Sequence, residues 1–209
     1  MARRKSLAFL DVGQGDCFVA DTKSGAIIFD GGSSSEDQVG RYRILPYMKY
    51  LGYQKIQIAV ISHMDIDHYS GIKELLEMGK IKYLGLPEIP KDETMKKIIG
   101  IAKKRGTTIF YLSRGRQITT KDGSLKVLHP QKNSQMEKNA ASLVMQGKIL
   151  GYRVLLTGDV EKEGEEELLL EELERADILK AAHHGSKNST SNEFLQKVQP
   201  KQTVISCGK

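Results

Sequence analysis

The sequence "HMDIDH", residues 63–68, places two histidines and two aspartates within six positions. Imidazole nitrogens and carboxylate oxygens together suit Zn²⁺, Mn²⁺ or Fe²⁺. A pair of such cations roughly 3.5–4 Å apart can hold both the attacking and the leaving oxygen in phosphoester hydrolysis. We therefore interpret His63, Asp65, Asp67 and His68 as candidate ligands of a two-metal site. In an extended or tightly looped backbone these side chains could converge while Met64 and Ile66 pack inward. The alternative is a polar loop with incidental histidines.

Two further segments carry residues of the same types at predicted strand ends. "VLLTGD" ends in Asp159, whose carboxylate could bridge two cations, and "LKAAHHGS" contains His183 and His184. For Asp159 taken alone, capping of the following helix is the more common role of an aspartate. For the histidine segment, the alternative is a polar loop before a helix capped by Ser191. Because successive strand residues point to opposite faces, we expect one histidine to be a ligand and the other a proton donor, without deciding which.

Other polar residues near these segments are candidates for supporting roles. Ser186, Lys187 and Ser189 follow the two histidines and could reach phosphate oxygens. Asp16 in "GQGD" and Asp30 in "FDGG" could orient metal ligands through hydrogen bonds. The alternative for both aspartates is turn formation, because Asp beside Gly favours turns.

The elements that must position these residues alternate between strand and helix. The apolar run "IQIAVIS" before His63 is typical of a buried strand. We expect strands or strand pairs at 6–12, 17–22, 26–32, 56–63, 81–87, 107–113, 116–130, 141–147, 152–159, 177–182 and 203–208. We expect helices at 41–53, 71–79, 92–106, 161–175 and 191–198, and the segment 130–139 resembles a linker. We interpret His129 as an ordinary loop residue.

The predicted fold class is α/β (α+β), with two β-sheets packed face to face and helices outside. The 209 residues, 39% hydrophobic and 28% charged, fit a single folded domain over 1–209. No apolar run reaches the 18 or so residues of a membrane span. Cys17 and Cys207 have no CxxC spacing, which argues against a disulfide scaffold or a thiolate zinc site. The net charge of +6 is compatible with a polyanionic partner, but the basic residues are dispersed.

The order "FDGG", "HMDIDH", "TGD", "HHGS" resembles the metallo-β-lactamase fold superfamily, whose signature is HxHxDH, over essentially the whole chain. Within it, "LDVGQGDCFV", "NAASLVM" and "LKAAHHGSKNSTS" look like the C-terminal hydrolase domain of ComEC-type DNA-uptake proteins. This resemblance implies a four-layer αββα sandwich and a dinuclear metal site. It also implies a nuclease that degrades the DNA strand that is not taken up, with DNA, single-stranded above all, as its partner.

Carried over by position, the resemblance makes His63, Asp65, Asp67, His68 and Asp159 metal ligands, with one of the two histidines of "HHGS" as a further ligand. As a working assignment we take His183 as that ligand, and Asp67 and His184 as the catalytic residues, although the sequence does not decide between the two histidines. The sequence departs from the superfamily pattern at two places. Asp65 replaces a histidine, which makes the site more oxygen-rich and favours Mn²⁺ or Mg²⁺ over Zn²⁺. Asn139 and Ser142 stand where relatives often supply another histidine, so one metal would be held weakly, and these two residues become substrate-binding candidates with Ser186 and Lys187.

The hypothesis for the mechanism is that the cations make a water more acidic while Asp67 orients it or accepts its proton for attack on phosphorus. Two other functions remain open. One is hydrolysis of a small or cell-wall substrate, such as a phosphocholine ester or a lactone, because the fold does not fix the substrate. The other is a metal-poor, non-catalytic module that binds DNA or a membrane partner.

The resemblance also bears on location and extent. A ComEC-type domain would be attached to a membrane channel domain and face outward from the cell membrane, whereas the chain alone resembles a soluble protein. ComEC-type sequences usually continue past the segment equivalent to "VISCGK" to an Asn and a GHP-like histidine motif. The resemblance therefore leaves open whether a C-terminal part of the site is missing.

Overall fold

The first half of the chain builds one six-stranded sheet and the helices that cover it. The computed structural model describes residues 5–136 and 139–208. The strands are β1 (Ser6–Phe9), β2 (Phe18–Thr22), β3 (Gly25–Phe29), β4 (Ile56–Val60), β5 (Ile81–Pro87) and β6 (Thr108–Leu112). They lie in sequence order, with β1–β3 antiparallel and β3–β6 parallel. The helices are the π-helix η1 (Gly40–Ile44), α1 (Leu45–Tyr50), α2 (Ile66–Glu77) and α3 (Glu93–Lys104).

The second half repeats this plan in reverse spatial order. Its strands are β7 (Gln117–Thr120), β8 (Gly123–His129), β9 (Val144–Ile149), β10 (Tyr152–Leu156), β11 (Ile178–Lys180) and β12 (Gln202–Val204). They are ordered β12-β11-β10-β9-β8-β7, with β7–β10 antiparallel and β10–β12 parallel. The helical elements are α4 (Lys162–Leu169), the 3₁₀ turn η2 (Ala182–Gly185) and α5 (Asn192–Val198).

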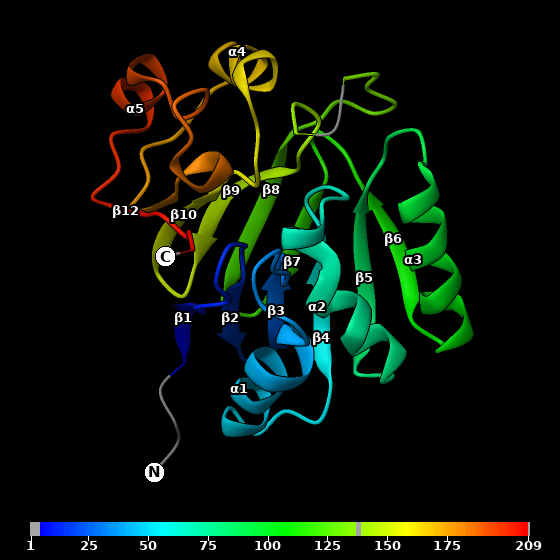
Figure 1. Cartoon of the computed structure of the whole chain (residues 1–209). Coiled ribbons are helices and arrows are strands. Elements are labelled where there is room, and N and C mark those ends of the chain that lie inside the picture. The colour runs from blue at the N-terminus through cyan, green and yellow to red at the C-terminus, as the bar shows by residue number, and fades with distance from the viewer. Residues whose placement is uncertain (1–4, 137–138, 209) are drawn as a thin grey trace.

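Three apolar clusters define four layers. One cluster joins the inner faces of the two sheets, with Phe18 and Phe29 from the first sheet and Met145 and Leu156 from the second. A second cluster lies between the first sheet and α1–α3, and a third lies between the second sheet and α4 and α5. Figure 1 shows α2 and α3 over strands β4–β6 and α4 and α5 beside the second sheet. The expected sandwich of helices, sheet, sheet and helices is confirmed.

One element begins earlier than the sequence pattern indicated. We expected an extended or looped backbone through His68, with Met64 and Ile66 packed inward. Instead Asp65 occupies the N-cap position and α2 starts at Ile66, whose side chain is 53% exposed. Met64 does pack against the core. The helical period places Asp67 and His68 in the first turn, at the end of α2 that lies beside the ends of β3 and β4.

Candidate metal centre

Three loops are joined through their backbones beneath the site. The N–H of Asp16 donates to the carbonyl of Asp67 (3.1 Å), and the N–H of Gly31 donates to the carbonyl of His68 (2.9 Å). The N–H of Gly32 donates in turn to the carbonyl of Asp16 (3.2 Å). A Cβ atom on Gly32 would lie 2.5 Å from a backbone oxygen at the start of α2. Only glycine allows this close approach, so the "FDGG" loop fixes where the "HMDIDH" segment lies.

Asp30 contacts the ring of His68. The residue has a positive φ of 57°, which turns its side chain towards the "HMDIDH" segment. One carboxylate oxygen accepts the N–H of Ser62 (2.7 Å), and the other lies 3.0 Å from Nδ1 of His68. A carboxylate on one ring nitrogen fixes the tautomer so that the other nitrogen can act as a ligand. Asp30 therefore lies where it could orient the ring of His68.

The "HHGS" segment is a strained turn, which corrects the expectation that strand alternation separates the two histidines. His183 and His184 both have positive φ, 46° and 53°. Such conformations are uncommon outside glycine and persist where the surroundings hold them. Nδ1 of His184 lies 2.7 Å from the carbonyl oxygen of Ser206, which directs Nε2 inward. His183 is 32% exposed, and its Nδ1 lies 2.8 Å from Oε1 of Glu161.

The inward-facing atoms converge on one place. Nε2 of His68 lies 3.1 Å from Oδ2 of Asp159, and Nε2 of His184 lies 3.4 Å from the same oxygen. Oδ2 of Asp67 lies 3.2 Å from Nε2 of His184. Both Nε2 atoms are buried without a hydrogen bond of good geometry. In each of the two histidines, the other ring nitrogen, Nδ1, faces an oxygen outside this group. The two Nε2 atoms and the neighbouring carboxylate oxygens therefore form a set of ligand atoms that fits a divalent cation.

We call His68, Asp67, Asp159 and His184 the crowded half of the site. Asp16 also belongs to a group, with His68, Asp159 and His184, in which one ligand atom per residue lies within 4.8 Å of the others. Its nearest ring nitrogens, however, are the outer Nδ1 atoms, at 3.7 Å from His68 and 3.8 Å from His184. Asp16 thus lies behind the two rings, which agrees with a supporting role.

Lys180 is the site residue that the sequence reasoning missed. Its side chain is 5% exposed, and its ammonium contacts the carboxylate of Asp16 directly. The ammonium also lies 3.6 Å from Oδ1 of Asp159 and donates to the carbonyl of Gly158 (3.3 Å). Lysine is almost never buried unless it is paired. Its place three residues before the histidine pair, at the end of an apolar strand, is the signal that could have identified it.

The crowded half is strongly polarised. Burial lowers the pKa of His184, but the neighbouring carboxylates of Asp159 and Asp67 outweigh this and raise that pKa to about 10. Burial also acts against charge on His68, yet Asp30 and Asp159 raise its pKa well above the ordinary value. Burial opposes ionisation of Asp159 and Asp67, but the two histidines hold the pKa of each carboxyl below its usual range. The carboxylates are therefore ready to accept positive charge.

His63 and Asp65 form the other part, which we call the sparse half. His63 is buried, its Nδ1 lies 3.0 Å from Oγ of Ser62, and its Nε2 lies 3.7 Å from Oδ2 of Asp65. The His63 and His68 rings are adjacent, with centroids 4.2 Å apart. In residues 5–136 and 139–208, no group of three possible ligand residues includes His63 or Asp65.

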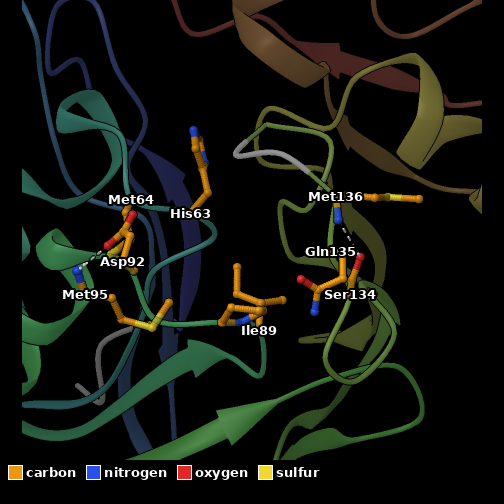
Figure 2. A pocket seen from close by; sticks show the side chains of 9 residues that line it. His63, Met64, Ile89, Asp92, Met95, Ser134, Gln135 and Met136 are labelled. Carbon is orange, nitrogen blue, oxygen red and sulfur yellow. Dashed lines mark hydrogen bonds between the residues drawn. The ribbon is translucent and has the colours of Figure 1, made fainter.

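A cavity of about 250 Å³ opens beside the sparse half and is lined in part by His63. Figure 2 shows Met64, Asp92 and Met95 on one side of it and Ser134 and Gln135 on the opposite side. His63 is thus shared between the candidate metal centre and a neighbouring space large enough for part of a ligand.

The expected substrate-contacting residues lie in different places. Ser142 is fully buried, and its hydroxyl accepts the N–H of Asp159 (3.3 Å), so it holds the Asp159 backbone. The carbonyl of Asn139 accepts the N–H of Ser142 (3.0 Å). Ser186 caps the turn of its own loop by accepting the N–H of Asn188 (3.3 Å), and Lys187 is exposed. Of these residues, Ser142 has the most direct structural connection to the crowded half.

Two alternative interpretations are resolved by the structure. Helix α4 has Glu161 at its N-cap, so Asp159 does not cap it. His129 is not a loop residue, because it ends β8 and is fully buried. Its Nδ1 lies 3.0 Å from the carbonyl oxygen of Ser142, while burial lowers its pKa. His129 therefore supports the loop beneath Asp159 from behind.

Residues 10–209 match the metallo-beta-lactamase superfamily, and the chain belongs to this superfamily. The chain is 36% identical to ComE operon protein 3 of Bacillus subtilis (strain 168), over 96% of this chain and 28% of that protein. It is 29% identical to competence protein ComA of Neisseria gonorrhoeae, over 95% of this chain and 26% of that protein. The chain thus spans about a quarter of the length of these relatives.

Solved structures support the fold. Human tRNase Z, short form, superimposes with a TM-score of 0.57 at 14% identity, covering 97% of this chain and 92% of that one. At this identity the likeness concerns the fold alone.

Among the described residues, no helix is both long enough and apolar enough to cross a membrane.

Proposed function

We propose that this domain is a metal-dependent phosphodiesterase that cleaves DNA, single-stranded DNA above all, during competence-related uptake. The observation that carries the proposal is the convergence of two buried, unpartnered Nε2 atoms with the carboxylates of Asp67 and Asp159. The competence relatives support the biological setting. In a longer protein of that kind, the domain would work beside a membrane channel domain, on the outer side of the cell membrane.

The residues of the crowded half would hold the first cation through His68, His184, Asp67 and Asp159. His63 and Asp65 would contribute to a second, weaker position. A divalent cation, with Mn²⁺ or Zn²⁺ as the leading candidates and Mg²⁺ as a third, would supply Lewis acidity towards a phosphate oxygen and increase the acidity of water.

Two side chains would take part in the proton transfers, Asp67 at the attacking water and His183 at the leaving oxygen. Asp67 stays ionised because the nearby imidazole of His184 and the charge of His68 outweigh its burial and hold its pKa low. It therefore accepts a hydrogen bond from the attacking water and orients it. His183 is more exposed than His184, and its Nδ1 faces Oε1 of Glu161 while its Nε2 lies 4.0 Å from Oδ2 of Asp159, at the edge of the site. We therefore assign protonation of the leaving oxygen to His183 and not to His184.

The test combines metal analysis with a cleavage assay on wild type and Asp67→Asn. The expected result is that wild type retains cations and cuts single-stranded DNA with Mn²⁺. Asp67→Asn should lose cleavage by at least about a hundredfold, within the range expected for removal of a proton-transfer group. Asp37→Asn, the same chemical change at an exposed position, is the matched control and should cleave normally. Retained metal with turnover of small esters but not of DNA would contradict the proposal.

A further inference from the structure

The cavity beside His63 has two facing walls. One wall carries Met64 and Met95, and Met64 packs against the core cluster that contains Met95. The opposite wall, which we call the polar wall, carries Ser134 and Gln135 together with Met136. Figure 2 shows Ile89 between the two walls and His63 above them. An occupant of this cavity would meet methionine side chains on both walls and hydrogen-bonding groups at Ser134 and Gln135.

The size and charge of the cavity limit what could occupy it. Its volume of about 250 Å³ is smaller than the roughly 300–1,000 Å³ of pockets that enclose a whole drug-sized ligand, so it suits a single ring system. Asp92 lines it, and its carboxylate accepts the N–H of Met95 (2.7 Å) as the N-cap of α3. A fixed negative charge in the wall disfavours a phosphate group. The favoured occupant is therefore a neutral part of the substrate.

We infer that this cavity binds one unpaired nucleobase of the DNA strand whose phosphate lies at the metal centre. The inference rests on the proposed function and names the part of the substrate that this side of the site recognises. A base is flat and apolar on its faces and polar at its edge, which matches a lining of apolar side chains with hydrogen-bonding groups at Ser134 and Gln135. Methionine sulfur makes favourable contacts with aromatic rings, and three methionines, Met64, Met95 and Met136, line the cavity.

Continuity with the metal centre favours this occupant over an unrelated ligand. His63 lines the cavity, and its ring lies 4.2 Å from that of His68, the first histidine of the crowded half. A phosphate at the metal centre would therefore have an adjoining base within reach of the cavity. Only a base that is not paired could enter, so the cavity selects single-stranded over double-stranded DNA.

The experiment measures binding so that it does not depend on cleavage. A short single strand carrying 2-aminopurine at one position would be titrated with Asp67→Asn protein, and the position moved along the strand. At one position the fluorescence should change, and an abasic nucleotide there should weaken binding about tenfold, as loss of one stacked base does. Ile89→Trp, which fills the cavity, should weaken binding of the intact strand by a similar factor and leave the abasic strand unaffected.

Two further variants separate the possible outcomes. Gln135→Ala changes an exposed residue of the polar wall and should weaken binding of the intact strand a few-fold without affecting folding. Gln131→Ala, the same chemical change at an exposed position of the same loop outside the cavity, is its control. Equal binding of intact and abasic strands at every position, or equal effects of Ile89→Trp on both, would overturn the inference. Cleavage by wild type is scored separately, so failure of the proposed function is distinguishable from failure of the base pocket.

Discussion

The crowded and sparse halves of the site differ in how closely carboxylates approach the Nε2 atom of each histidine. Nε2 of His184 lies 3.2 Å from Asp67 and 3.4 Å from Asp159, and Nε2 of His68 lies 3.1 Å from Asp159. In the crowded half, His68 and His184 each have one ring nitrogen fixed by an oxygen, from Asp30 at 3.0 Å and from Ser206 at 2.7 Å. In the sparse half, His63 has the Ser62 hydroxyl on one nitrogen and Asp65, at 3.7 Å, near the other. The difference teaches that a motif with two histidines and two aspartates need not build two equal groups of possible ligands. We expect one cation to be held tightly and the other weakly.

The largest effect should follow from removing charge at the centre of the crowded half. Asp159→Asn keeps the side-chain shape but takes a negative charge from beside both Nε2 atoms. We expect the tight cation to be lost, with an affinity decrease beyond the roughly 10–100-fold that loss of an outer hydrogen-bond partner costs. Calorimetric titration of metal-free protein with Mn²⁺ measures this as two phases of binding, a tight phase for the first cation and a weak phase for the second. Asp37→Asn is the matched control. An unchanged tight phase in Asp159→Asn would contradict the assignment of the tight cation to the crowded half.

Removal of the buried ammonium should mainly change stability. Lys180→Met leaves Asp16 buried without its cationic partner, and breaking a buried pair typically costs about 3–5 kcal/mol of unfolding free energy. We expect a smaller loss in saturating Mn²⁺, because a bound cation supplies positive charge beside the same carboxylates. Denaturant unfolding with and without Mn²⁺ tests this, with the exposed Lys187→Met as control. Equal losses in both conditions would show that Lys180 is not coupled to the crowded half.

A smaller effect is expected when the outer partner of His68 is changed. Asp30→Asn preserves shape but no longer fixes the ring nitrogen with a charged acceptor. We expect the tight affinity for Mn²⁺ to fall about 10–100-fold. The weak phase should change less, because Asp30 contacts His68 and not His63. A selective loss of the weak phase instead would reverse the assignment of the two halves.

The smallest effect should come from Ser62→Ala, the corresponding change in the sparse half. The Ser62 hydroxyl lies 3.0 Å from Nδ1 of His63 but 3.5 Å from Nδ1 of His68, which keeps Asp30 as its nearer partner. We expect the tight phase to change by less than about tenfold, below the range for an outer-shell carboxylate. The same Mn²⁺ titration reports it. A larger effect on the tight phase than that of Asp30→Asn would be inconsistent with the contacts.

The order of the elements and the three converging strand ends were predictable from the sequence. Continuous apolar runs before His63 and Asp159 mark buried strands, and polar residues at their ends gather at one edge of a sandwich. The start of α2 was not predictable to the residue, because "HMDIDH" satisfies both an extended and a helical pattern. The expectation that Ile66 packs inward was wrong for this reason.

Features that depend on long-range backbone approach could not be read from the sequence. The Ser206 carbonyl on His184 and the Gly32 contact with α2 join segments far apart in the chain. The choice between His183 and His184 depends on two consecutive positive φ angles, which no periodicity indicates. His129 looked like a loop residue before a proline, yet tertiary packing buries it completely.

The most direct test of the two unequal halves is to measure the number and the affinities of bound Mn²⁺ in wild type, His184→Ala and His63→Ala. The electron paramagnetic resonance signal of free Mn²⁺ gives both quantities by difference. The account predicts a tight and a weak phase in wild type, loss of the tight phase in His184→Ala, and its survival in His63→Ala. Loss of the tight phase in His63→Ala together with its survival in His184→Ala would contradict the assignment.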